Sequence, residues 1–186
     1  TVLAMCLCLC AAAGAEVAVA QDSRASPVHA TTLAMPVKLT PADRNFLAQA
    51  GASNQKEIDV SVMVAQKATL PKVKEFASMM VRDHTKLGAD LKKLDDGAVP
   101  ASVVAPQPNP LADVSGKALD QAYMTMMVDD QASVQIQFGV VSRAAKYSPA
   151  VPHDAIAALP HIRHHAALAR GMSYTVRGKV PPRTRS

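Results

Sequence analysis

Aromatic residues are scarce in this chain. Phe, Trp and Tyr together make up only 3% of the 186 residues, and Trp is absent. All-β domains are enriched in aromatic and β-branched side chains, so this scarcity argues against one. Hydrophobic residues nevertheless make up 49% of the sequence, which excludes general disorder. The core must therefore be built from Ala, Val, Leu and Met, whose side chains suit the close packing of helices.

Cysteine is absent after the first ten residues. The three cysteines are Cys6, Cys8 and Cys10. If this stretch is cleaved off, the mature protein contains no cysteine. It then has no disulfide, no thiolate metal ligand and no cysteine nucleophile. A chain without thiols is suited to an oxidising compartment.

Motifs of nucleophilic and phosphate chemistry are also missing. The sequence has no Gly-x-Ser-x-Gly and no glycine-rich phosphate loop. Its formal charge is +5, and removal of residues 1–20 takes away one acid, Glu16, and no Lys or Arg, which gives +6. The basic residues lie mostly among acids, without interleaved aromatics, so we expect no nucleic-acid partner. The basic charge is compatible with an envelope protein or an anionic surface as the partner. A homo-oligomer is a further alternative.

An apolar run lies near the start of the chain. Residues 2–15 are continuously apolar, shorter than the ~20 residues that a membrane-spanning helix needs. Ala18-Val19-Ala20 follows, and this small-x-small pattern predicts cleavage before Gln21. We therefore expect a signal peptide over residues 1–20, truncated at its start, and a periplasmic or outer-envelope protein. The alternative is an uncleaved N-terminal anchor.

Four helices are predicted after a linker over residues 21–39. Thr40-Pro41-Ala42-Asp43 is a helix-start pattern, with an N-cap Thr and Pro at the first helical position. Apolar periodicity and breakers predict helices over about 41–69, 71–96, 115–147 and 150–171. We expect the bundle to span residues 40–172 and residues 173–186 to form a basic, disordered tail.

The connections between these helices define the expected fold. Short turns join the first helix to the second and the third to the fourth, whereas the Pro-rich segment 97–114 joins the two pairs. Short turns make neighbouring helices antiparallel, so we expect an all-α, antiparallel four-helix bundle of two hairpins. Residues 79–84 (Met-Met-Val-Arg-Asp-His) and 126–131 (Met-Met-Val-Asp-Asp-Gln) also form a faint internal repeat.

Polar residues interrupt the apolar stripes of the predicted helices. His84, for example, lies four residues after Met80 and three before Leu87, which is a core position. At ~1.5 Å per residue from the nearest turn, one such group on each helix reaches a similar depth. Carboxylates and imidazoles in one layer would suit Fe, Mn or Zn. The candidate metal ligands are Glu57, His84, Asp130, His161 and His165, with Asp83 and Gln131 as second-shell candidates.

Two other interpretations of these residues stay open. The polar groups could form a buried hydrogen-bonded network that fixes helix register, with His84 bonded to Glu57 or Asp130. Thioethers could instead bind Cu(I), although Met in a core without Trp is more often filler. The methionines concerned are Met63, Met79, Met80, Met124, Met126 and Met127.

Several motifs together resemble an exported bacterial family, the domain-of-unknown-function family 4142, which is regarded as ferritin-like. The resemblance covers about residues 40–172 and implies a ferritin-like four-helix fold, an envelope location and no settled activity. Where the family pattern carries a second Asp-His, this chain has Gln131, which removes one candidate ligand. His84, Asp83, Asp130 and His165 match the pattern. The motifs are Pro41-x-Asp43-x-x-Phe46-Leu47, Asn54-x-x-Glu57-Ile58, Lys67-Ala68, Pro71-x-Val73-Lys74-x-Phe76-Ala77, Met80-Val81-x-Asp83-His84-Thr85, Tyr123-x-x-x-Met127-Val128-x-Asp130 and Leu159-Pro160-x-Ile162-x-x-His165.

The sequence thus favours an exported binding or stress-related protein over an enzyme. Its expected site is an inward-facing divalent-metal or structural polar site. The enzyme alternative, a metal-dependent redox or peroxide-consuming protein, requires bound iron or manganese. The remaining alternatives are a copper-binding periplasmic protein and a purely structural or partner-binding bundle.

Overall fold

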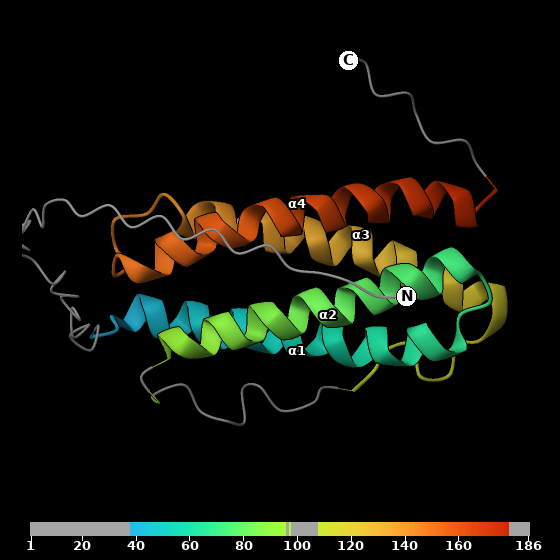
Figure 1. The fold of residues 1–186 in the computed structure, drawn as a ribbon, viewed down its shortest axis with the longest axis horizontal. Coiled ribbons are helices and arrows are strands. Elements are labelled where there is room, and N and C mark those ends of the chain that lie inside the picture. The colour runs from blue at the N-terminus through green and yellow to red at the C-terminus, as the bar shows by residue number, and fades with distance from the viewer. Residues whose placement is uncertain (1–37, 96, 98–107, 179–186) are drawn as a thin grey trace, which may run out of the picture. The chain divides into compact units, whose positions relative to one another are not determined.

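The protein is built from four α-helices, as Figure 1 shows for a computed structural model. The structure describes residues 38–95, 97 and 108–178, so the predicted signal peptide, most of the linker and the end of the tail lie outside it. The helices are α1 (Pro41–Lys67), α2 (Pro71–Leu94), α3 (Gly116–Val141) and α4 (Ala150–Val176). They belong to one compact unit, and the described residues contain no strand. The predicted all-α four-helix bundle is confirmed.

The first helix begins at the predicted residue because its cap is complete. The Asp43 backbone N–H donates to the Thr40 hydroxyl at 3.1 Å, and the Thr40 N–H donates to the Asp43 carboxylate at 2.7 Å. This capping box satisfies two backbone donors that the helix cannot satisfy itself. Asp43 also accepts a hydrogen bond from the Ser148 N–H at 3.0 Å, so it ties the start of α1 to the turn between α3 and α4.

A side chain from α3 fixes the turn between α1 and α2. The buried Asp120 carboxylate accepts hydrogen bonds from the backbone N–H groups of Thr69 (2.9 Å) and Leu70 (3.0 Å), and also from the Thr69 hydroxyl. Leu70 is the N-cap of α2 and supplies no side-chain cap of its own. Asp120 therefore holds the start of α2 from the neighbouring hairpin.

Two helix ends differ from the prediction. Helix α3 ends at Val141 instead of Tyr147. In the turn that follows, the Tyr147 ring packs edge to face on the Phe46 ring, with 6.1 Å between the ring centroids. Helix α4 continues past Gly171 to Val176, because Met172 and Val176 still have the apolar core to pack against. Both differences arise from contacts with distant residues.

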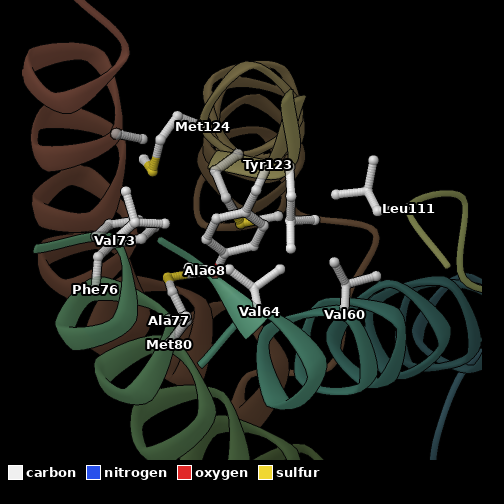
Figure 2. Close-up of a cluster of buried hydrophobic side chains, with 13 residues drawn as sticks. Val60, Val64, Ala68, Val73, Phe76, Ala77, Met80, Leu111, Tyr123 and Met124 are labelled. Carbon is white, nitrogen blue, oxygen red and sulfur yellow. The ribbon is translucent and has the colours of Figure 1, made fainter. Parts of the chain in front are cut away.

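The helices of each hairpin, α1 with α2 and α3 with α4, pack closely against each other. Contacts between hairpins are sparser, and they run through α2 with α4 and α1 with α3. The apolar core forms two clusters. One surrounds Val64, Met80, Tyr123 and Met127 (Figure 2), and the other contains Phe46, Leu91, Phe138 and Ile162.

No described helix has both the length and the apolar character needed to span a membrane.

Candidate functional site: a buried polar layer and an adjoining groove

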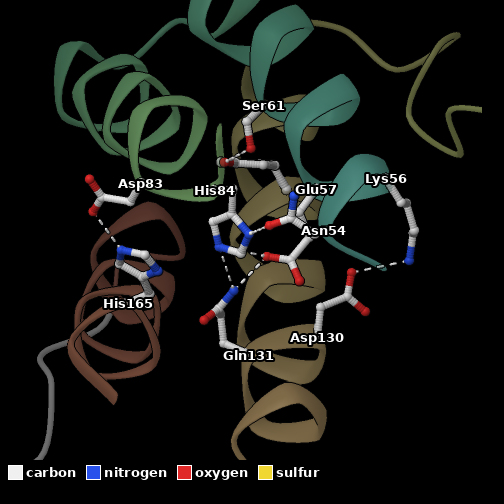
Figure 3. A network of polar contacts seen from close by, with 10 residues as sticks. Asn54, Lys56, Glu57, Ser61, Asp83, His84, Asp130, Gln131 and His165 are labelled. Carbon is white, nitrogen blue, oxygen red and sulfur yellow. Dashed lines mark hydrogen bonds and ion pairs between the residues drawn. The ribbon is translucent and has the colours of Figure 1, made fainter. Parts of the chain in front are cut away.

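A layer of polar side chains separates the two apolar clusters. Each helix contributes one residue to it: Glu57 from α1, His84 from α2, Gln131 from α3 and His165 from α4 (Figure 3). All four are at most 2% exposed. We call these four residues the polar layer. Burying polar groups is costly unless they are hydrogen-bonded, so their bonds decide which chemistry the layer can support.

His84 lies at the centre of the layer. Its Nδ1 is 3.0 Å from the Asn54 side-chain oxygen, and its Nε2 is 3.3 Å from Glu57 Oε2 and 3.4 Å from Gln131 Nε2. Because the Asn54 oxygen can only accept, Nδ1 carries the hydrogen and Nε2 presents a lone pair. Burial, together with the neighbouring His165, lowers the pKa of His84 to about 3. The imidazole is therefore neutral at neutral pH.

Glu57 is neutral as well. Burial, reinforced by the negative charge of Asp130, raises the pKa of Glu57 to about 8. Its contact with His84 is therefore one between two neutral groups and not an ion pair. The Gln131 amide also donates to Glu57 Oε2, at 2.5 Å. Within the described part of the chain, neither Glu57 Oε1 nor Gln131 Oε1 has a hydrogen-bond partner.

His165 carries the layer across to the second hairpin. Its Nε2–H donates to the Asp83 carboxylate at 2.8 Å, and its ring centroid is 5.4 Å from that of His84. The other nitrogen, Nδ1, is then an acceptor, and among the described residues nothing donates to it. Burial lowers the pKa of His165, against the opposing effect of Asp83. In Figure 3 this second nitrogen lies on the side of the ring that faces His84.

Asp130 and His161, two of the predicted site residues, lie outside the layer. The Asp130 side chain is 25% exposed and pairs with Lys56 Nζ at 3.1 Å. The inward face of α3 instead carries Gln131, four residues after the buried Met127. Met126 is likewise only half-buried, so the inward-facing residue at this level of α3 is Gln131 and not the predicted Asp130. His161 is exposed on α4 and borders the groove described below.

Sequence reasoning also missed the role of Asn54 and placed Gln131 only in a second shell. The internal repeat already contained the signal for Gln131, since it aligns His84 with Gln131 and Asp83 with Asp130. The structure preserves this relation, because both aspartates pair with a side chain of the other hairpin. Asn54 lies three residues before Glu57 and so shares its helix face.

The polar layer offers a limited set of metal ligands. Glu57 Oε2 and His84 Nε2 converge, and Asn54 holds the other imidazole nitrogen as second-shell groups do around metal-bound histidines. The Gln131 amide oxygen could act as a third ligand if the side-chain amide rotated so that its oxygen and nitrogen exchanged places. Over the residues that the structure describes, however, no group of three or more His, Cys, Asp or Glu side chains is arranged to hold a metal ion. The buried methionines Met80, Met124 and Met127 pack within the first apolar cluster.

A groove of about 400 Å³ lies between α2 and α4 and ends at this layer. Its walls are mainly apolar, and its inner end is formed by Asp83, His84 and His165. Leu87 and Leu94 are half-buried and border this groove. The volume falls within the ~300–1,000 Å³ typical of small-molecule sites. The apolar lining comprises Leu87, Leu91, Leu94, Phe138, Ala157, Ala158 and Ile162.

Fold and site together define a four-helix bundle with a buried glutamate–histidine–amide layer beside an apolar groove. The family model described as "Domain of unknown function (DUF4142)" matches residues 28–172. The chain therefore belongs to this family, as its motifs indicated. No curated protein and no solved structure matches the chain.

Proposed function

We propose that this chain is an exported helical binding protein that takes a small amphiphilic molecule into the groove between α2 and α4. The observation that carries the proposal is the groove itself, an apolar hollow of about 400 Å³ that ends on two buried histidines. Apolar pockets with a few convergent polar groups of perturbed pKa are the usual form of ligand sites. Export is supported by the apolar residues 2–15 and by Ala18-Val19-Ala20, all outside the described residues.

The groove stands out because it is a large apolar space beside a closely packed bundle interior. Protein interiors are close-packed, and voids larger than a water molecule are few. The groove opens where the two hairpins contact each other sparsely. Leu91, Phe138 and Ile162 form its floor and are buried, whereas Leu87 and Leu94 keep part of their apolar surface accessible. A ligand with an apolar body would cover this surface.

A neutral amphiphile tests the proposal. We expect 4-phenylbutan-1-ol to bind the chelator-treated protein with a Kd on the order of 1 mM or tighter, measured by perturbation of backbone amide resonances. Ala157→Phe places a ring in the groove from an exposed position and should abolish binding. Ala167→Phe, at another exposed alanine of α4 that does not line the groove, is the matched control. Absence of binding, or equal binding by both variants, would refute the proposal.

Divalent-metal binding is the second candidate function, and one specific observation favours it. His84 Nε2 and Glu57 Oε2 lie 3.3 Å apart, a separation that two ligands of one ion commonly have, and Asn54 fixes the imidazole in the tautomer that a metal requires. A bound ion would displace the proton from Glu57. Fe, Mn or Zn would suit this nitrogen and oxygen set better than copper.

Calorimetric titration with Zn²⁺, Mn²⁺ and Fe²⁺ distinguishes this candidate from a purely structural layer. We expect one equivalent of ion to bind the mature protein, and this binding to be lost in His84→Gln but kept in His164→Gln, which alters an exposed histidine. Circular dichroism would establish that both variants fold. Lack of binding to the wild-type protein, or equal binding by both variants, would leave the layer as a hydrogen-bonded network that sets helix register.

A further inference from the structure

We infer that the groove between α2 and α4 selects amphiphilic primary amines, with the ammonium group beside Asp83 and the apolar body along α2 and α4. This inference rests on the proposed ligand-binding function and adds the chemical class of the ligand. It is carried by the hydrogen-bonding character of the groove's inner end and by the balance of charges along its walls.

At the inner end of the groove, both buried imidazoles have their ring hydrogens engaged, and the exposed His161 lies one turn before His165 on α4. The single ring hydrogen of His165 points to Asp83, and that of His84 points to Asn54. The accessible carboxylate there is that of Asp83, whose side chain is 35% exposed and which can accept more bonds than the one from His165. Among the described residues, the buried Nδ1 of His165 also has no donor. An ammonium group supplies three donors.

The charges along the groove favour a cation. Lys86 and Lys93 share the carboxylate of Asp90, at 2.6 and 2.7 Å, and the charge of Asp154 also acts on Lys93. Three aspartates and two lysines line the groove, which leaves a net charge of −1 with histidines counted as neutral. A carboxylate or phosphate head would meet the like charge of Asp83. Apolar walls strengthen such electrostatic selection, because they lower the local dielectric.

The geometry of α2 and α4 sets the orientation of the ligand. Asp83 lies beside His165 at the inner end, whereas Lys93 lies near Asp154 at the outer end. The leucines at 87, 91 and 94 follow Asp83 along α2 toward that outer end. An amine head at Asp83 would therefore place its apolar body against this leucine stripe.

Three compounds with one body and different heads test the inference. We would titrate the full chain, treated with chelator at pH 7, with 4-phenylbutylamine, 4-phenylbutan-1-ol and 4-phenylbutanoate. We expect the amine to bind at least tenfold more tightly than the alcohol, and the acid to bind most weakly. Equal affinities for amine and alcohol would overturn the amine preference while leaving a ligand-binding groove intact. If none of the three compounds binds, the proposed function fails as well.

Two variants separate the role of Asp83 from general effects of charge. Asp83→Asn keeps an oxygen that can accept from His165 but removes the negative charge, so the amine should lose about tenfold in affinity and the alcohol less than twofold. Asp129→Asn removes an exposed aspartate on α3 that does not border the groove and should change neither affinity. Unfolding midpoints would show that both variants are folded. An Asp83→Asn protein that binds the amine as tightly as the wild type would contradict the inference.

Discussion

Gly88 shows how one residue without a side chain supports the polar layer. A Cβ at this position would lie 2.8 Å from the Asn54 side-chain nitrogen, whereas a Cβ at Gly171 would meet no atom within 4 Å. The Asn54 side chain is not free to move away without cost, because its oxygen accepts the hydrogen bond from His84. Glycine on α2 therefore makes room for the group that fixes the tautomer of His84.

Substitution of the two glycines gives a matched comparison. Alanine in place of glycine in a helix usually stabilises by ~1 kcal/mol, and we expect Gly171→Ala to show this gain. In Gly88→Ala the displacement of Asn54 should cancel the gain, and the ¹⁵N shifts of the His84 ring should change. Urea unfolding and imidazole NMR would measure both effects. Equal stabilisation by the two substitutions would show that Asn54 is not held as described.

Glu57 makes stability depend on pH in a direction unusual for a carboxyl group. Its pKa is raised to about 8 in the folded protein. Its contribution to the free energy of unfolding is therefore fully present below its ordinary pKa of 4.5 and is lost as the pH rises toward 8. The pKa of His84 is lowered to about 3, so its contribution is present above 6.5 and is lost as the pH falls toward 3. Between pH 4.5 and 6.5 the two effects oppose each other.

The Glu57→Gln variant should show how much of the stability lost above pH 6.5 is due to Glu57. From pH 6.5 to 8 we expect the wild-type protein to lose about 2 kcal/mol of unfolding free energy relative to the variant, since one proton changes stability by ~1.4 kcal/mol per pH unit. Chemical unfolding at several pH values would measure the difference. Glu75→Gln, which changes an exposed carboxyl on α2, should follow the wild-type curve. Parallel curves for the wild type and Glu57→Gln would mean that Glu57 is ionised in the fold.

At the scale of the helices, the ends that depend on local residues were predictable and the ends that depend on distant contacts were not. Pro41 and Pro71 mark the starts of α1 and α2 in sequence and structure alike. The inward-facing residues in the middle of α3 were not predictable in the same way, because Met124, Met126 and Met127 make several faces of the helix apolar there. Periodicity then cannot choose between Asp130 and Gln131. The internal repeat, which aligns Gln131 with His84, favours Gln131, and packing places it inside. The groove depends on the separation of α2 and α4, which no local pattern encodes.

Asp120 belongs to α3, but its effect is on the turn between α1 and α2. Asp120→Ala would leave the Thr69 and Leu70 N–H groups without their buried acceptor, so we expect a loss of about 2 kcal/mol or more in unfolding free energy. Asp113→Ala, at an exposed position before α3, should change it by less than ~0.5 kcal/mol. Guanidinium unfolding of both variants would measure this. A loss as small for Asp120→Ala as for the control would mean that water replaces the carboxylate.

For the molecule as a whole, the polar layer divides one apolar core into two and spans all four helices. Apolar replacements of buried polar networks are often neutral or stabilising by 1–4 kcal/mol. We therefore expect the layer to contribute more to specificity than to stability, by favouring one register of the two hairpins along the bundle axis.

A triple replacement tests this view of the layer. We expect the variant Glu57→Leu, His84→Leu, Gln131→Leu to unfold at the same or a higher urea concentration than the wild type. We also expect its amide spectrum to broaden as the hairpins gain alternative registers. A sharp spectrum with strongly reduced stability would show that the hydrogen bonds of the layer stabilise the fold directly.

The unequal contacts within and between the hairpins also bear on the order of folding. Contacts between residues near in sequence form faster than distant ones. The two helices of a hairpin follow each other in the chain and pack more closely than helices of different hairpins, so the hairpins should form before they dock. The hydrogen bond from Gln131 to Glu57 joins the two hairpins, so it forms only when they dock. If docking follows the transition state, this bond is absent from it. Stopped-flow measurements on Gln131→Ala would then give a φ-value near zero, with faster unfolding and an unchanged folding rate. In kinetic terms, the layer would govern how long the folded protein lasts and not how quickly it forms.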